Sequence, residues 1–178
     1  MRNVQKVISG LCLMFVGGAV YAADASTAGN AHYVTCVACH GDNAQGDRAM
    51  GAPRLNHLQA VYIDAQLRKF RSGLRGGEGA TDAAKQMAAM AAVLPDEQAI
   101  ADVSAYIASL DSEASAATNE GDVALGGDYY NQFCGACHGA AGVGNPALNS
   151  PRLAGSDDWY LEAQIHAFRA GQRGAHAD

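Results

Sequence analysis

The sequence has no cysteine to spare for a structural disulfide. It contains five cysteines, and Cys12 lies alone in an apolar N-terminal segment. The other four form two Cys-x-x-Cys segments, made of Cys36 and Cys39 and of Cys134 and Cys137. A fold held together by a disulfide framework is therefore excluded. In an exported protein, the thiols of these two pairs are expected to serve in another kind of covalent bond.

Basic residues are also scarce. Lys and Arg number 12 against 18 Asp and Glu, so the net charge is −6 at pH 7 with neutral histidines. Nucleic-acid-binding proteins neutralise phosphates with clustered Lys and Arg, and this composition argues against that class. A protein partner with a basic face fits better, because opposite charges steer the encounter of two proteins.

No apolar run is long enough to be a confident membrane span. Residues 7–20 are apolar and follow Arg2 and Lys6, which is the pattern of a secretory signal. We place the cleavage after Ala22, so that residues 1–22 are the signal peptide and the mature protein is periplasmic. Because Arg2 and Lys6 leave with that segment, the net charge falls from −6 to −8. An uncleaved membrane anchor is the alternative, although the run is shorter than the ~20 residues of a usual span.

Strand-like alternation of apolar and polar residues is absent, so we predict an all-α fold. Helices are expected at about 28–38, at 61–71 and from Pro95 to Leu110, where Ile100, Val103, Ile107 and Leu110 form a buried stripe. A glycine-rich loop is expected at 71–81. Residues 111–125, rich in Ser, Ala and acids, are predicted to be a linker.

The second half of the chain repeats the first at an offset of 98 residues without gaps. Gly29 matches Gly127, and the segment at 53–55 matches the one at 151–153. The matched side chains further along are Tyr62, Gln66, Phe70, Arg71 and Arg75 with Tyr160, Gln164, Phe168, Arg169 and Arg173. A constant offset through helices and loops predicts two copies of one domain, at 23–110 and 126–178.

Each copy contains one Cys-x-x-Cys-His segment, Cys36 to His40 and Cys134 to His138. This spacing is typical of covalent haem attachment. The two thiols lie about one helical turn apart, so they can bond both vinyl groups on one edge of a porphyrin. The following histidine then supplies the proximal imidazole to the iron. A zinc half-site and a thioredoxin-like redox pair are the alternatives, but two copies favour two c-type haems per chain.

The sixth iron ligand is predicted from the methionines. Methionine thioether is a usual sixth ligand in electron carriers and raises the reduction potential. Met50 lies too close to His40 in sequence to reach around a porphyrin easily, which leaves Met87 and Met90 in a segment that can cross the distal face. We favour Met90, with core packing as the alternative role for either.

Other polar residues receive weaker assignments. The carbonyls of Pro53 and Pro151, each thirteen residues after a motif histidine, either accept the imidazole hydrogen or simply mark turns. Surface packing and haem-propionate binding are both open for Tyr62, Tyr160, Trp159, Arg71, Arg75, Arg169 and Arg173. His32, His57, His166 and His176 lack any motif context and are expected to be exposed.

These motifs resemble the periplasmic di-haem cytochromes c related to cytochrome c4. The resemblance rests on both Cys-x-x-Cys-His-Gly segments, the Pro-Arg-Leu segments, the Tyr-x-x-x-Gln stretch that ends in Phe-Arg-x-Gly-x-Arg, and Met90 to Leu94. It implies two tandem class I cytochrome c domains. It also implies that the iron ligand is the methionine four residues before the leucine at the entry to the last helix. That leucine is Leu94, so the resemblance supports Met90. The metal ligands are then His40, Met90 and His138.

The resemblance implies an electron carrier with no catalytic residues. Its partners would be a terminal oxidase, a reductase or a dehydrogenase, with peripheral membrane association possible and nucleic acid excluded. The alternatives are a haem enzyme or gas sensor with an open iron, and a cytochrome subunit of an oxidase or dehydrogenase complex. No methionine follows His138. We therefore expect an incomplete second domain, from a truncated version of a longer protein, with a poorly covered second haem.

Overall fold

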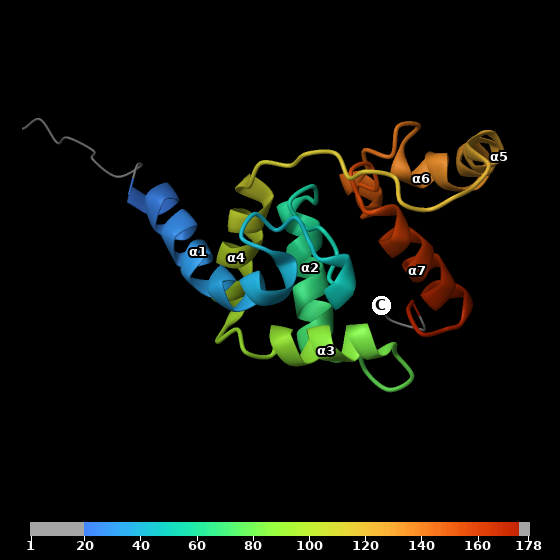
Figure 1. Cartoon of the computed structure of the whole chain (residues 1–178). Coiled ribbons are helices and arrows are strands. Elements are labelled where there is room, and N and C mark those ends of the chain that lie inside the picture. The colour runs from blue at the N-terminus through green and yellow to red at the C-terminus, as the bar shows by residue number, and fades with distance from the viewer. Residues whose placement is uncertain (1–19, 175–178) are drawn as a thin grey trace, which may run out of the picture.

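A computed structural model describes residues 20–174, and their side chains from Thr27 onward. The chain forms two helical halves joined by an extended strap (Figure 1). The first half contains α1 (Val20–His40), η1 (Arg48–Met50), α2 (Ala60–Arg71), α3 (Asp82–Ala91) and α4 (Glu97–Ser109). The second contains α5 (Val123–Tyr129), the π-turn η2 (Tyr130–Cys134), α6 (Gly135–His138), η3 (Pro146–Leu148) and α7 (Asp158–Arg169).

The all-α prediction is confirmed. Within residues 20–174 the only β pairings are two isolated bridges, Asp47 with Ala52 and Asn145 with Ser150. Their positions differ by 98 residues, so both halves fold the loop after the histidine in the same way. No helix in this part of the chain is both long and apolar enough to span a membrane. Most of the predicted signal peptide lies outside the described residues, and its cleavage stays a prediction.

Several element boundaries differ from those predicted. α1 begins at Val20, about eight residues earlier than expected, and α5 begins at Val123, inside the predicted linker 111–125. The segment with Met87 forms α3, because Thr81 caps the backbone N–H of Ala84 and alanines follow. α4 begins at Glu97, with Asp96 as its N-cap, rather than at Pro95.

The core of the first half lies where α4 packs against α1 and α2, and where α2 packs against α3. Ile100, Val103 and Ile107 of α4 are buried as predicted, whereas Leu110 is only half-buried against this core. Tyr33 of α1 and Phe70 of α2 are also buried there. α1 and α4 lie side by side (Figure 1). Their close approach depends on a glycine, because a Cβ on Gly29 would overlap the carbonyl oxygen of Asp102 and come within 2.6 Å of Cβ of Tyr106.

Replacing Gly29 by alanine is therefore expected to destabilise the first half by about 1–3 kcal/mol, since backbone atoms must move to admit the methyl group. The matched control is Gly126→Ala in α5, where nothing lies within 4 Å of the added Cβ. There the better helix propensity of alanine is expected to stabilise by up to ~1 kcal/mol. Urea unfolding of both variants checks this pair, and equal effects would contradict it.

The repeat has one insertion that the sequence comparison missed. Tyr33 donates its hydroxyl hydrogen to the carbonyl of Gly41 at 2.7 Å, and Tyr130 makes the equivalent bond to Gly139 at 2.6 Å. These spans are eight and nine residues, so the second copy has one extra residue before its motif. The π-turn η2 absorbs it, as such bulges do. The offset is therefore 97 before the motif, and Gly29 corresponds to Gly126 rather than to Gly127.

The second half is less covered than the first in the described part of the chain. Cys134 and Cys137 are exposed, whereas Cys36 and Cys39 are half-buried. Large apolar side chains of α5 and η2 face solvent, including Val123 at 87% and Phe133 at 68% exposure. This agrees with the expected poor covering of the second site.

The connecting strap, residues 111–122, is tied to both halves rather than free. Asp111 accepts hydrogen bonds from the side chains of Asn43 and Asn56 through its carbonyl. Further on, the hydroxyl and backbone N–H of Thr118 donate to Asp158 at the start of α7. These hydrogen bonds, the hydroxyl's first, hold the pKa of Asp158 well below its usual value. The strap therefore fixes how the two halves meet.

Candidate functional site

The first half contains a large, mostly apolar pocket between α1, α2, α3 and α4. The first Cys-x-x-Cys-His segment lies on one side, with Cys36, Cys39 and His40 in the pocket lining. Other lining residues come from the segment at 50–55, from α2 and from α3. The second half also contributes to this lining, with Tyr160, Gln164, Ala167, Gln172 and Arg173. The pocket is thus completed by the second domain.

His40 ends α1 and is held in one orientation. It is 7% exposed, and its Nδ1 lies 2.8 Å from the carbonyl oxygen of Pro53. A carbonyl can only accept, so Nδ1 carries the hydrogen and Nε2 keeps the lone pair. Burial lowers the pKa of His40 and favours the neutral imidazole, opposed by the bond to Pro53. A neutral imidazole with a free Nε2 lone pair is the form that binds iron.

The second motif repeats this arrangement. Nδ1 of His138 lies 2.9 Å from the carbonyl oxygen of Pro151. Of the two roles left open for Pro53 and Pro151, the structure shows the hydrogen bond to the motif histidine in both copies. Among the residues with described side chains, no group of three His, Cys, Asp or Glu is placed to hold a metal ion, as a complete zinc site would need.

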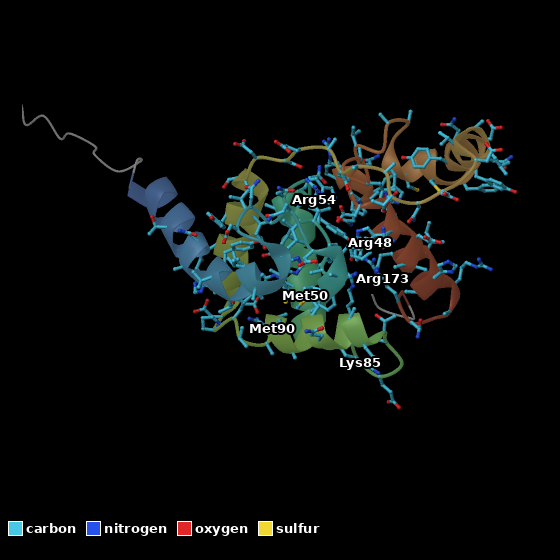
Figure 2. The ribbon with its side chains drawn as sticks, in the orientation of Figure 1. Arg48, Met50, Arg54, Lys85, Met90 and Arg173 are labelled. Carbon is cyan, nitrogen blue, oxygen red and sulfur yellow. The ribbon has the colours of Figure 1, made fainter. Side chains whose placement is uncertain are left out.

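Three methionines line the same pocket. Met50, Met87 and Met90 all contribute to its lining. Met50 lies just before the segment whose Pro53 carbonyl holds His40, so it belongs to the histidine's side of the pocket. Met87 and Met90 lie on α3, which supplies a separate wall. Figure 2 shows Met50 and Met90 on these two elements.

The face of α3 toward the pocket favours Met87 over Met90. The lining residues of this helix are Ala83, Ala84, Gln86, Met87, Met90 and Ala91. Successive residues of a helix are rotated by about 100°, which places Met87 near the middle of that face. Met90 is rotated by about 60° from Met87, toward one edge of the face. Met90 is also 38% exposed, while Met87 packs against the buried core. The choice of Met90 made from the sequence stays a prediction, with Met87 the better placed of the two.

The charges of the pocket suit an anionic ligand group. Arg54, Arg75 and Arg173 line it, and no Asp or Glu is among its lining residues within the described chain. Arg75 is 7% exposed, and its Nε is buried without a hydrogen-bond partner. A buried guanidinium with an unused donor can bind a carboxylate, and haem carries two propionates. The residues present therefore fit a haem.

Four of the polar residues singled out in the sequence meet between the halves: Tyr62, Tyr160, Arg75 and Arg173. Arg71 instead pairs with Glu97 at the start of α4. Trp159 packs edge-on against Tyr160, and Arg169 is exposed. The sequence comparison matched Gln66 with Gln164 but gave neither a role, although each accepts hydrogen bonds from both arginines.

His57 is not exposed, in contrast to the sequence-based expectation, because the second half covers it. Its Nε2 lies 2.7 Å from the hydroxyl of Ser156, and its Nδ1 is buried without a hydrogen-bond partner. Burial lowers the pKa of His57 to about 4; Asp157 opposes this shift, while Arg54 and Arg152 add to it. His57 therefore stays neutral in the folded protein at pH values where the unfolded chain binds a proton.

The lowered pKa of His57 predicts that the protein loses stability in acid. The pKa of His57 is lower in the folded state than in the unfolded chain. The contribution of neutral His57 to stability is therefore fully present above the unfolded pKa of about 6.5, and it is lost as the pH falls toward about 4. Allowing for partial exposure of the ring, the loss is about 2 kcal/mol. His57→Gln should reduce the difference in unfolding free energy between pH 7 and pH 4 by about that amount. An unchanged difference in this variant would contradict the assignment to His57.

A proximal imidazole oriented by a proline carbonyl, beside two thiols at the end of a helix, defines a c-type cytochrome. The pattern is present twice, and the chain binds two haems covalently. When bound, each haem supplies one iron that changes between Fe(III) and Fe(II). We propose that Cys36, Cys39 and His40 hold the first haem and that Cys134, Cys137 and His138 hold the second.

Comparison with known proteins agrees with this class. The family described as "Cytochrome c" matches residues 26–111, and "Cytochrome C oxidase, cbb3-type, subunit III" matches residues 121–178. The thiosulfate dehydrogenase electron acceptor of Stutzerimonas stutzeri (strain A1501) is 34% identical, over 97% of this chain and 83% of its own length. The protein of the same description from Thiomonas intermedia (strain K12) is 36% identical, over 97% of this chain and 81% of its own length.

The fold is likewise shared with a solved di-haem protein. The crystal structure of reduced recombinant cytochrome c4 from Pseudomonas stutzeri has a TM-score of 0.67 at 27% identity, over 86% of this chain and 84% of that one. The chain belongs to the cytochrome c family, among the di-haem cytochromes related to cytochrome c4, and its function is electron transfer.

Proposed function

We propose that this protein accepts single electrons in the periplasm from an enzyme that oxidises thiosulfate. The observation that carries the proposal is the similarity to two thiosulfate dehydrogenase electron acceptors, at 34% and 36% identity over 97% of this chain. Thiosulfate would be oxidised at the partner enzyme. The electrons released there would reduce two Fe(III) to two Fe(II), one on each domain of this chain.

The features of the first site support a carrier rather than an enzyme. The neutral imidazole of His40 and a thioether of α3, for which we propose Met87 or Met90, would both bind the iron of the first haem. A six-coordinate iron changes oxidation state without binding substrate. The apolar walls exclude water, which reduces the reorganisation that accompanies electron transfer.

An oxidase is proposed as the protein that takes the electrons onward. The second domain matches the family of a cbb3-type oxidase subunit. A cbb3-type oxidase is accordingly the first candidate to test. The alternative that this chain is itself part of an oxidase complex predicts stable co-purification with that oxidase, whereas a carrier is expected to bind it transiently.

The test is a stopped-flow experiment with the oxidised, haem-loaded protein. A purified thiosulfate dehydrogenase and thiosulfate should together reduce its haems rapidly, with a rate that saturates as this protein's concentration rises. Thiosulfate alone should leave the haems oxidised over the same time. Reduction no faster than that of an unrelated monohaem cytochrome c would contradict the proposed donor while leaving the electron-transfer class intact.

A further inference from the structure

The boundary between the two halves is built around the guanidinium group of Arg75. This residue belongs to the first half and lines its haem pocket. Its Nη1 donates to Oε1 of Gln66 at 2.6 Å, within the same half. Its Nη2 donates across the boundary, to the hydroxyl of Tyr160 at 2.9 Å and to Oε1 of Gln164 at 3.1 Å. Two of its three hydrogen-bond acceptors therefore come from the second domain.

The remaining contact of this guanidinium is with an aromatic ring. Its central carbon lies 4.5 Å from the centroid of Phe70, a buried residue that also lines the pocket. Phe70 and Gln66 hold Arg75 from the first half, and Tyr160 and Gln164 hold it from the second. Without the second domain, the guanidinium would lose two acceptors and gain access to water.

The position of this charge matters for a redox site. Reduction adds one negative charge to the haem, so a fixed positive charge nearby stabilises the reduced form and raises the potential. The effect is larger where water is excluded, because the effective dielectric constant is lower. The three protein acceptors of Arg75 are uncharged, so its charge stays available to the haem and its propionates.

We propose that Tyr160 and Gln164 are positioning residues for the first haem, which hold Arg75 at its pocket from the other domain. The potential of the first haem then depends on the second domain being docked. The inference rests on haem binding and electron transfer and is independent of which enzyme donates the electrons.

Arg173 of the second half makes the equivalent contacts toward the first half. Arg173 of the second half donates to Gln164 at 2.7 Å, and it reaches across the boundary to the hydroxyl of Tyr62 at 3.0 Å. Its guanidinium carbon lies 4.6 Å from the centroid of Phe168. In Figure 2 Arg173 lies between α7 and the first half. This pairing makes the boundary approximately two-fold symmetric.

Tyr160→Phe is the main test, because it removes one acceptor of Arg75 and keeps the ring. The haem-loaded protein is titrated with a reductant and followed by NMR, with the first haem assigned through its contacts to Ile63 in the pocket lining. We expect a lower midpoint potential for the first haem and a smaller shift for the second. An unchanged potential of the first haem would overturn the proposal.

A double-mutant cycle separates positioning from a direct effect of the tyrosine on the haem. Arg75→Gln should also lower the potential of the first haem. In that background, Tyr160→Phe should have no further effect, because the charge that it positions is gone. If the shift caused by Tyr160→Phe persists in the Arg75→Gln background, Tyr160 acts directly and the proposal is wrong.

The control for simple loosening of the boundary is Ser156→Ala. It removes the hydrogen bond to His57 between the two halves, and neither residue is bonded to Arg75. We expect this variant to leave the potential of the first haem unchanged. A shift equal to that of Tyr160→Phe would mean that any weakening of the boundary has this effect, which would overturn the specific role of Tyr160.

Discussion

Replacing Met87 by alanine is expected to convert the first haem from a low-spin, six-coordinate centre to one that binds carbon monoxide. Loss of the thioether also removes a ligand that favours Fe(II). The midpoint potential of this haem should fall by more than about 60 mV, a tenfold change in a one-electron equilibrium. Absorption spectra with and without carbon monoxide, together with a redox titration, measure both effects.

Met90→Ala is the matched control, three residues along the same helix. Met90 lies toward the edge of the pocket-facing side of α3 and is 38% exposed. We expect the variant to stay low-spin and to shift the potential by a smaller amount. The reversed pattern, with carbon monoxide binding only to Met90→Ala, would assign the ligand to Met90, as the sequence-based prediction has it.

Removing both thiols of one motif is expected to remove one haem in either half, with an effect on stability that differs between the halves. Cys36→Ala with Cys39→Ala, and Cys134→Ala with Cys137→Ala, should each reduce the intact mass by one covalently bound haem and leave the other attached. A haem stain that survives denaturation should persist in both variants. Two bound haems in either variant, or free thiols with zinc in the unaltered protein, would contradict the haem assignment.

Only the double replacement in the first motif should lower the stability of the first half. Ile63, Leu67 and Phe70 belong to the buried core and also line the first pocket, so an empty pocket leaves a cavity in that core. A cavity the size of a large side chain lowers the free energy of unfolding by about 3–5 kcal/mol. For a domain of this size, such a loss lowers Tm by more than about 10 °C. Cys134 and Cys137 are exposed, and their replacement should leave the unfolding of the first half unchanged.

The fold class and the proximal half of each site could be predicted from the sequence, because the contacts involved are local. The spacing of Cys36, Cys39 and His40 on one helix follows from helix geometry. The proline thirteen residues later reaches the histidine through a short loop, and the same loop recurs at Pro151. The stripe of Ile100, Val103 and Ile107 likewise placed α4 in the core. Within residues 20–174, these predictions needed little beyond local periodicity.

The sequence favours Met90 as the ligand, whereas the position of each side chain in the pocket favours Met87. Both are apolar, flexible and three residues apart, so composition and spacing do not separate them. The difference arises from the rotation of α3 about its axis, which is set by packing of Ala91 and Ala88 against the rest of the core. Rotation of a helix depends on all of its neighbours and is not encoded in a short segment.

The sequence by itself determined the two haem motifs and the approximate positions of several helices, since each depends on residues within about one helix or loop of each other. It also determined the repeat, because the 98-residue offset is constant from the motif onward. Only the tertiary structure decided what happens between the two halves. Arg75 meets Tyr160 across 85 residues, and His57 meets Ser156 across 99. The strap and the docking of α7 create both contacts. Long-range hydrogen bonds of this kind follow from the relative placement of two folded domains, which local sequence patterns do not specify.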